Sequence, residues 1–235
     1  MTFIEIMTEL EKLSDEQTKK TLMRHGAREP FFGVKVADLK TILKKTKKNH
    51  ELSLQLFATG NSDAMYLAGL MADETKISKE QLNDWVQNAY WSYLNEFAVP
   101  WVASETKFGF ELGQEWIQSD IENIVAAGWS TLSSYAAITP DEKLDIKVYS
   151  QLLDKVANEI HEAPNRVRQT MNAFVIAVGT YVKDLSDKSL ATALKMGKVY
   201  VDMNGTSCKV PSAVEYINKN INAGKIGIKR KMARC

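Results

Sequence analysis

The chain has 235 residues, of which 45% are hydrophobic and 25% are charged, and its formal net charge is +1. This composition is ordinary for a globular protein and excludes a protein that is basic throughout, as many nucleic-acid binders are. The first residues, MTFIEIMTELEKLSDEQ, contain acids where a secretory signal would have bases, and no apolar run approaches the roughly 20 residues that span a bilayer. We therefore expect a cytoplasmic protein without membrane association.

Helix-start signals occur at three places along the chain. Ser14 with Gln17, and Ser78 with Gln81, have the spacing of a capping box, in which each residue satisfies a backbone N–H near the other. The run TPDE at 139–142 combines a threonine cap with proline at the first helical position and glutamate at the third. Each of these signals predicts that a helix begins there.

Apolar residues recur at intervals of three and four in several segments, the pattern of a helix with one buried face. Sustained alternation of apolar and polar residues, which would indicate strands, is absent from the sequence. We therefore predict an all-α protein, with helices over residues 37–48, 63–73, 79–91, 144–160, 165–182 and 211–223.

The connections between these segments are short, and none is rich enough in Gly, Ser or Pro to be a domain linker. We expect one domain over residues 1–235, ending in a basic tail at 225–235. Helical pairs of about 35 to 45 residues favour an α-α superhelix, a HEAT-like helical-repeat solenoid, with an irregular helical bundle as the alternative.

The basic tail holds five basic residues and no acidic one, which leaves 25 of the 30 basic residues against 29 acidic residues in the rest of the chain. Each phosphate that such a tail neutralises adds salt-dependent affinity for nucleic acid. A solvated tail without a ligand is the alternative. The candidate phosphate-binding residues are Lys229, Arg230, Lys231 and Arg234.

The two cysteines, Cys208 and Cys235, lie far apart, and the chain has only three histidines. Zinc sites are usually built from closely spaced Cys and His ligands. We therefore expect no metal ion and no cofactor. Both cysteines are interpreted as free thiols, with a disulfide as the alternative.

Four stretches, in this order and spacing, resemble the AlkD family of DNA-alkylation-repair proteins, which are built from HEAT-like repeats. They are MRHGAREPFFGVKVADLKTILKK, the tryptophan-containing helix that runs into FAVPWVA, NRVRQTMNAFVIAVG, and the closing NGTSCKVPSAVEYINK with its basic tail. The resemblance implies binding of double-stranded DNA in a concave groove. It also implies removal of N3- or N7-alkylated purines by hydrolysis of the glycosidic bond, without the base flipping of other glycosylases.

The residues implied by this resemblance depart from the family in part. Trp91 matches the first active-site tryptophan, and Asn95 stands where the family has its catalytic aspartate. An amide brings no negative charge to a sugar on which positive charge develops, and losing one preorganised electrostatic group costs roughly 3 kcal/mol of transition-state stabilisation. Glu96 is the adjacent carboxylate, so Asn95 and Glu96 are the candidate catalytic residues.

Two further active-site positions of the family are changed. Its arginine aligns near Ala126, and its second tryptophan aligns at Ala173 or Phe174, of which only Phe174 keeps an aromatic ring. The resemblance therefore supports the fold and a DNA-facing groove more strongly than it supports glycosylase chemistry.

The helix that begins near Pro164 carries a line of polar side chains ahead of an apolar run, and such a line offers hydrogen-bond donors to phosphate oxygens. The alternative is that these side chains are only solvated, at the exposed start of a helix. The candidate nucleic-acid-binding residues are Trp91, Asn165, Arg166, Arg168, Gln169, Asn172 and Phe174, besides those of the tail.

Two functions stay open from the sequence. One is an alkylpurine DNA glycosylase whose partner is double-stranded, alkylated DNA. The other is a non-catalytic HEAT-repeat scaffold that binds nucleic acid or a protein partner, and the changes at Asn95 and Ala126 favour it. Trp91 itself is either a groove residue or part of the packed core, because aromatic residues at helical spacing usually fill cores.

Overall fold

The computed structural model describes residues 1–234, and within them every regular element is a helix, which confirms the all-α prediction. Cys235 lies outside the described residues, whereas Cys208 is a free, exposed thiol. The helices are α1 (Phe3–Lys12), α2 (Glu16–Arg24), α3 (Val36–Thr46), α4 (His50–Phe57), α5 (Ser62–Met71), α6 (Lys79–Asn88), the π-helix η1 (Tyr93–Ala98), α7 (Val99–Glu105), α8 (Gly109–Trp116), α9 (Glu122–Ile138), the 3₁₀-helix η2 (Asp141–Lys143), α10 (Ile146–Glu159), α11 (Asn165–Tyr181), the 3₁₀-helix η3 (Lys183–Leu185), α12 (Ser186–Met196) and α13 (Ala213–Asn222).

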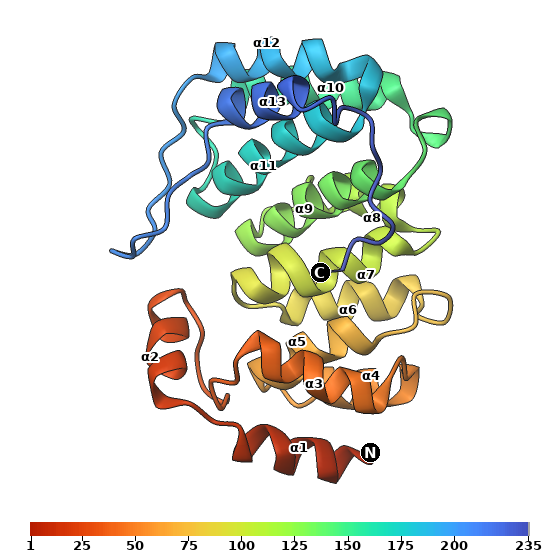
Figure 1. Cartoon of the computed structure of the whole chain (residues 1–235), viewed down its shortest axis with the longest axis vertical. Helices are drawn as coiled ribbons and strands as arrows, with labels where there is room; N and C mark the ends of the chain where they lie inside the picture. The colour runs from red at the N-terminus through yellow and green to blue at the C-terminus, as the bar shows by residue number, and fades with distance from the viewer. Residues whose placement is uncertain (235) are drawn as a thin grey trace.

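These helices stack along the long axis of the molecule, from α1 at one end to α12 and α13 at the other (Figure 1). Helices adjacent in sequence contact each other, as α4 does α5 and α11 does α12. This is the helical-repeat solenoid that the sequence predicts. Two segments project from the same side of the stack in Figure 1: α2, and the loop at 198–211 between α12 and α13. Throughout residues 1–234, no helix is long and apolar enough to cross a membrane.

The predicted helix starts have mixed outcomes. Ser78 and Gln81 form the predicted capping box at the start of α6. At α2, however, the cap is Asp15, whose carboxylate accepts from the Thr18 N–H, so the prediction of Ser14 is wrong by one residue. Thr139 ends α9, and the TPDE run forms only a short 3₁₀-helix before α10 begins at its own cap, Asp145.

Helix α9 joins the two halves of the core. One group of its side chains, including Ile124 and Ala127, packs into the N-terminal core, and another, including Trp129 and Leu132, packs into the C-terminal core. Gly128 allows α8 to approach, because a Cβ there would lie 2.7 Å from the Ile117 backbone nitrogen. Because α9 is apolar on opposite sides, its sequence lacks the pattern of a surface helix, in which one apolar face lies opposite one polar face.

The C-terminal tail leaves α13 and runs back along the stack toward α7 (Figure 1). It is attached at successive points: the Gly227 N–H donates to the Thr180 carbonyl, and the Arg230 N–H donates to the Ala137 carbonyl at 2.8 Å. Lys229 pairs with Asp141 at 2.7 Å. Residues 223–234 form no helix, and they make a strap that runs across the C-terminal half.

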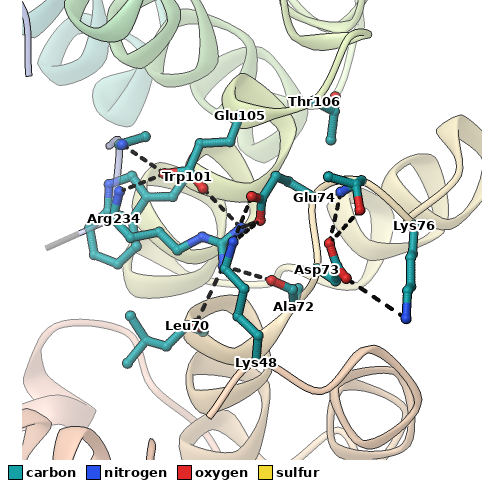
Figure 2. A network of polar contacts seen from close by, with 12 residues as sticks. Lys48, Leu70, Ala72, Asp73, Glu74, Lys76, Trp101, Glu105, Thr106 and Arg234 are labelled. Atoms are coloured by element: carbon teal, nitrogen blue, oxygen red, sulfur yellow. Dashed lines mark hydrogen bonds and ion pairs between the residues drawn. The ribbon is translucent and has the colours of Figure 1, made fainter. Parts of the chain in front are cut away.

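Arg234 closes this strap in the N-terminal half (Figure 2). Its side chain is 7% exposed, and its guanidinium pairs with Glu74 and with Glu105, each at 2.9 Å. It also donates to the Ala72 carbonyl at 2.7 Å. The sequence places Arg234 among the phosphate-binding residues, whereas the structure buries it between carboxylates of its own chain.

Replacing Arg234 with methionine is expected to lower the free energy of unfolding by about 3 kcal/mol, because it leaves the largely buried Glu105 without its cation and leaves Glu74 with Lys48 alone. Urea unfolding followed by circular dichroism measures this loss. The matched control is Lys231→Met, at an exposed tail position, which should change the free energy by no more than about 0.5 kcal/mol. Equal losses in the two variants would contradict the structural role of Arg234.

Candidate nucleic-acid interface

The stretch AYWSYLNEF at 89–97 is not one continuous α-helix. Helix α6 ends at Asn88, whose side-chain amide donates to the Asp84 carbonyl and so competes with the backbone bonds that would continue the helix. After a break at 89–91 the chain forms η1, a π-helix closed by a bond from the Val99 N–H to the Leu94 carbonyl. Pro100 follows, and because proline lacks an N–H and its ring crowds the carbonyl four residues back, it favours such a widened turn.

Trp91 lies in the break before η1 and is 4% exposed. Its indole Nε1 donates to the Ser62 hydroxyl at 2.8 Å, which satisfies the only polar group of the ring. The Tyr93 ring stacks on Trp91 with centroids 4.6 Å apart and an interplanar angle of 13°. The sequence allows Trp91 to be either a core residue or a groove residue. In the structure it is buried like a core residue, and it also supports a half-buried ring, Tyr93, that lines a cavity.

A cavity of about 400 Å³ opens beside these rings, and we call it the aromatic cavity. Segments from the whole length of the chain form its walls: the loop after α2, the segment around η1, the start of α9, the first turns of α11, and the loop at 198–211. Its aromatic lining consists of Tyr90, Trp91, Tyr93 and Phe97; its polar lining includes His25, Ser92, Glu96, Asn123, Arg166, Gln169, Asn204, Cys208 and Lys209.

The start of α5 holds two walls of this cavity in place. Ser62 accepts the Trp91 bond, and the neighbouring Asp63 accepts from the backbone N–H groups of residues 32, 33 and 34 at 2.6, 2.9 and 3.1 Å. Burial raises the pKa of the Asp63 carboxyl, and the three backbone hydrogen bonds oppose that shift. Asp63 thereby fixes the segment that connects α2 to the stack.

A bidentate ion pair between Glu96 and Arg166 crosses one wall of the cavity. The guanidinium Nε and one terminal nitrogen donate to the two carboxylate oxygens, each at 2.7 Å. The Glu96 side chain is 6% exposed and that of Arg166 is 30% exposed. Burial raises the pKa of Glu96, and the hydrogen bonds and charge of Arg166 oppose that shift. The pair is held further because the Arg166 backbone N–H donates to Glu122 at the start of α9.

This geometry limits the chemistry that the candidate catalytic residues can perform. Both oxygens of Glu96 are bound by Arg166, which also neutralises its charge. Asn95 is 1% exposed, does not line the cavity, and has a side-chain oxygen with no hydrogen-bond partner among residues 1–234. Neither Asn95 nor Glu96 therefore presents a free carboxylate to the cavity.

The polar line on α11 has two separate roles in the structure. Asn165 exchanges two hydrogen bonds with the backbone of Asp202, and Asn172 donates to the Pro211 carbonyl at 2.9 Å. These two residues hold the loop at 198–211 against α11. Gln169, by contrast, lines the aromatic cavity, and Arg168 is half-buried with its Nε unpaired among the described residues.

Several other predicted residues lie away from the cavity. Phe174 is fully buried and packs on Trp129 and Tyr149, so the structure places it in the C-terminal core rather than in a groove. Ala126 is likewise buried. In the tail, Lys229 is paired with Asp141 and Arg230 is half-buried, whereas Lys231 is exposed.

Sequence reasoning missed the residues that complete the cavity. Tyr93 and Phe97 stand in the quoted stretch, but only the break before η1 turns them toward the cavity beside Trp91. The loop residues Cys208 and Lys209 come from a turn-forming stretch, NGTSCKVP, whose place beside Tyr93 no local pattern indicates. Within residues 1–234 no cluster of three or more His, Cys, Asp or Glu side chains is placed to hold a metal ion.

Comparisons with known proteins match the whole chain. Residues 6–217 match the family described as "DNA alkylation repair enzyme". An uncharacterized protein of Listeria monocytogenes, Lmo0209, is 33% identical to this chain, and the match covers 96% of this chain and 100% of Lmo0209. An uncharacterized protein of Listeria innocua, Lin0241, is also 33% identical, and the match covers 94% of this chain and 98% of Lin0241. A solved structure is 36% identical with a TM-score of 0.91, covers 100% of both chains, and is described as "a new family of proteins related to the HEAT-like repeat DNA glycosylases with affinity for branched DNA structures".

A double-mutant cycle tests the ion pair. Arg166→Met is expected to lower the free energy of unfolding by about 2 kcal/mol, less than for a fully buried pair because the arginine is partly exposed. Combined with Glu96→Gln the loss should be smaller than the sum, with a coupling energy of at least about 1 kcal/mol. Arg168→Met combined with Glu96→Gln is the control and should show no coupling. Additive losses for Glu96 and Arg166 would refute the pair.

Proposed function

The chain belongs to the DNA alkylation repair enzyme family, and we propose that it binds branched DNA at the aromatic cavity without hydrolysing a glycosidic bond. The observation that carries this proposal is the ion pair between Glu96 and Arg166, which occupies the carboxylate nearest the position of the family's catalytic group. On this proposal the chain keeps the fold of the family and has lost its glycosylase chemistry.

Glycosidic hydrolysis needs a negative charge beside the sugar, because positive charge develops on the sugar in the transition state. A carboxylate that is already bound by a guanidinium offers little of that stabilisation. To act on the sugar, Glu96 would have to leave Arg166, and this would bury an unpaired charge at a cost of several kcal/mol. The amide of Asn95 carries no charge and does not line the cavity. The site therefore favours binding over catalysis.

Binding is supported by the rings and by cations at the rim. Lys209 lines the cavity from the loop at 198–211, and Arg28 packs over the ring of Tyr90, another lining residue, with its guanidinium carbon 4.4 Å from the ring centroid. Both are exposed. α2 and the loop at 198–211 project from the same side of the stack, so DNA that lies across the cavity meets both (Figure 1). Arg166 is paired with Glu96, so few cations at this site are free to bind phosphate. Recognition therefore depends on shape and stacking more than on phosphate contacts.

The proposed preference for branched DNA is supported by the solved structure that this chain resembles over its whole length. That protein is described as having affinity for branched DNA structures, and 36% identity over 100% of both chains supports a shared ligand class. A branch point exposes base faces and strand ends that a continuous duplex hides. The aromatic cavity, with the exposed Lys209 in its lining, suits such a target better than a long, smooth duplex.

The first test concerns catalysis. With DNA that contains N7-methylguanine or N3-methyladenine, the protein is expected to release free base no faster than the spontaneous rate, measured by chromatography of the released base. Freeing Glu96 by Arg166→Met, in protein shown to be folded, should not restore release, because Asn95 still stands at the catalytic position. Release above the spontaneous rate by the unaltered protein would contradict the proposal.

The second test concerns binding, measured by fluorescence anisotropy on a four-way junction and on a linear duplex of the same sequence. The junction should bind at least about tenfold more tightly, a difference of 1.4 kcal/mol. Lys209→Ala should weaken junction binding and reduce the slope of log K against log salt by about 1. The control, Lys147→Ala on α10, removes an exposed lysine remote from the cavity and should leave both unchanged. Equal affinity for junction and duplex would sink the proposal.

A further inference from the structure

We infer that the aromatic cavity receives one unpaired nucleobase from the branch point of the DNA, with its phosphates left at the rim. This inference rests on the proposed function and deepens it, since it names the part of branched DNA that the site recognises. Four observations carry it: the exposed rings, an unsatisfied acceptor, the size of the cavity, and the distribution of charge.

The rings form a platform that is supported from below. Trp91 is buried and fixed through its bond to Ser62, and Tyr93 stacks on it, so the position of the Tyr93 ring is set by the core. Phe97 is 40% exposed and meets Tyr93 nearly edge-on, at 85° and 6.1 Å. One flat ring with a second ring at a right angle makes a corner that a planar base can fill. Stacking on such rings is a common way to bind single-stranded nucleic acid without sequence preference.

The side-chain oxygen of Gln169 lacks a hydrogen-bond donor among residues 1–234. Gln169 is one of the residues that line the cavity, and this oxygen is buried. A buried acceptor without a donor is costly, and a ligand that supplies an N–H relieves that cost. Nucleobases carry N–H donors on their pairing edges. In a duplex those donors are used by the partner strand, so an unpaired base is the form that has them free.

Size and charge agree with a base inside the cavity and a phosphate outside it. A volume of about 400 Å³ lies within the range of small-molecule sites and is far too small for a duplex. Inside, Glu96 and Arg166 neutralise each other. Lys209 is the lysine among the residues that line the cavity, and it is exposed. A neutral, aromatic interior with a basic rim matches the two parts of one nucleotide.

The inference is tested with two three-way junctions, one fully paired and one carrying a single unpaired 2-aminopurine at the branch. This base analogue loses fluorescence when it stacks on an aromatic ring. Binding of the unaltered protein is expected to quench it and to favour the junction with the unpaired base. Tyr93→Leu should abolish the quenching and weaken binding to that junction by about tenfold, and it should weaken binding to the fully paired junction much less, so that the preference for the unpaired base is lost.

Further variants keep the test decisive where Tyr93→Leu affects folding. Tyr93→Phe retains the ring and should retain the quenching, whereas Phe97→Leu, at a more exposed position, should reduce it. Gln169→Leu should lower the preference for the unpaired base severalfold. Tyr216→Leu, an exposed tyrosine on α13, is the matched control and should behave like the unaltered protein.

The outcomes separate the inference from the proposed function. Equal binding of both junctions with unchanged 2-aminopurine fluorescence would overturn the inference and leave binding of branched DNA intact. Equal weakening of both junctions by Tyr93→Leu would overturn it as well, since the ring would then serve the branch in general. Failure of the unaltered protein to bind either junction would overturn the proposed function, and the inference with it.

Discussion

The partly buried ion pair between Glu96 and Arg166 connects the middle of the helical stack to its C-terminal half. Glu96 belongs to η1 and Arg166 to the first turn of α11, and the backbone of Arg166 is tied in turn to Glu122 on α9. Three helices thus meet at one bidentate contact. Removing Arg166 would leave the Glu96 carboxylate buried without its cation, so the pair holds these walls of the aromatic cavity together and keeps the carboxylate paired.

The same contact explains how this chain differs from the glycosylases that it resembles. The resemblance places a catalytic carboxylate at the position of Asn95, and in the structure Arg166 binds both oxygens of the neighbouring carboxylate, Glu96. What is left at the site is a stacked pair of rings, Trp91 and Tyr93, beside a cavity of about 400 Å³. A site of this kind supports recognition of a nucleotide more readily than attack on a sugar.

The local signals of the sequence predicted much of the fold. Segments with one apolar face became helices, as residues 79–88 did, with the capping box of Ser78 and Gln81 at their start. Helix α9 was not predicted because it is buried on opposite sides and lacks a polar face. Phe174 was expected in the groove, but a sequence alignment does not show which way a helix faces, and it lies in the core against Trp129. The tail was recognised as basic, yet the partners of Arg234 are more than 120 residues away along the chain.

The sequence by itself determined the helical class, which depends on short-range periodicity that can be read along the chain. Its resemblance to the AlkD family implied the repeat architecture, the active-site position of Trp91 and the replacement of the catalytic aspartate by Asn95. Only the tertiary structure decided that Glu96 is paired with Arg166, 70 residues away, that Tyr93 is the ring presented to the cavity, and that Arg234 closes a strap rather than facing a phosphate. The physical reason is that a charge or a ring acts through its neighbours in space, and these neighbours come from helices that meet only when the stack is assembled.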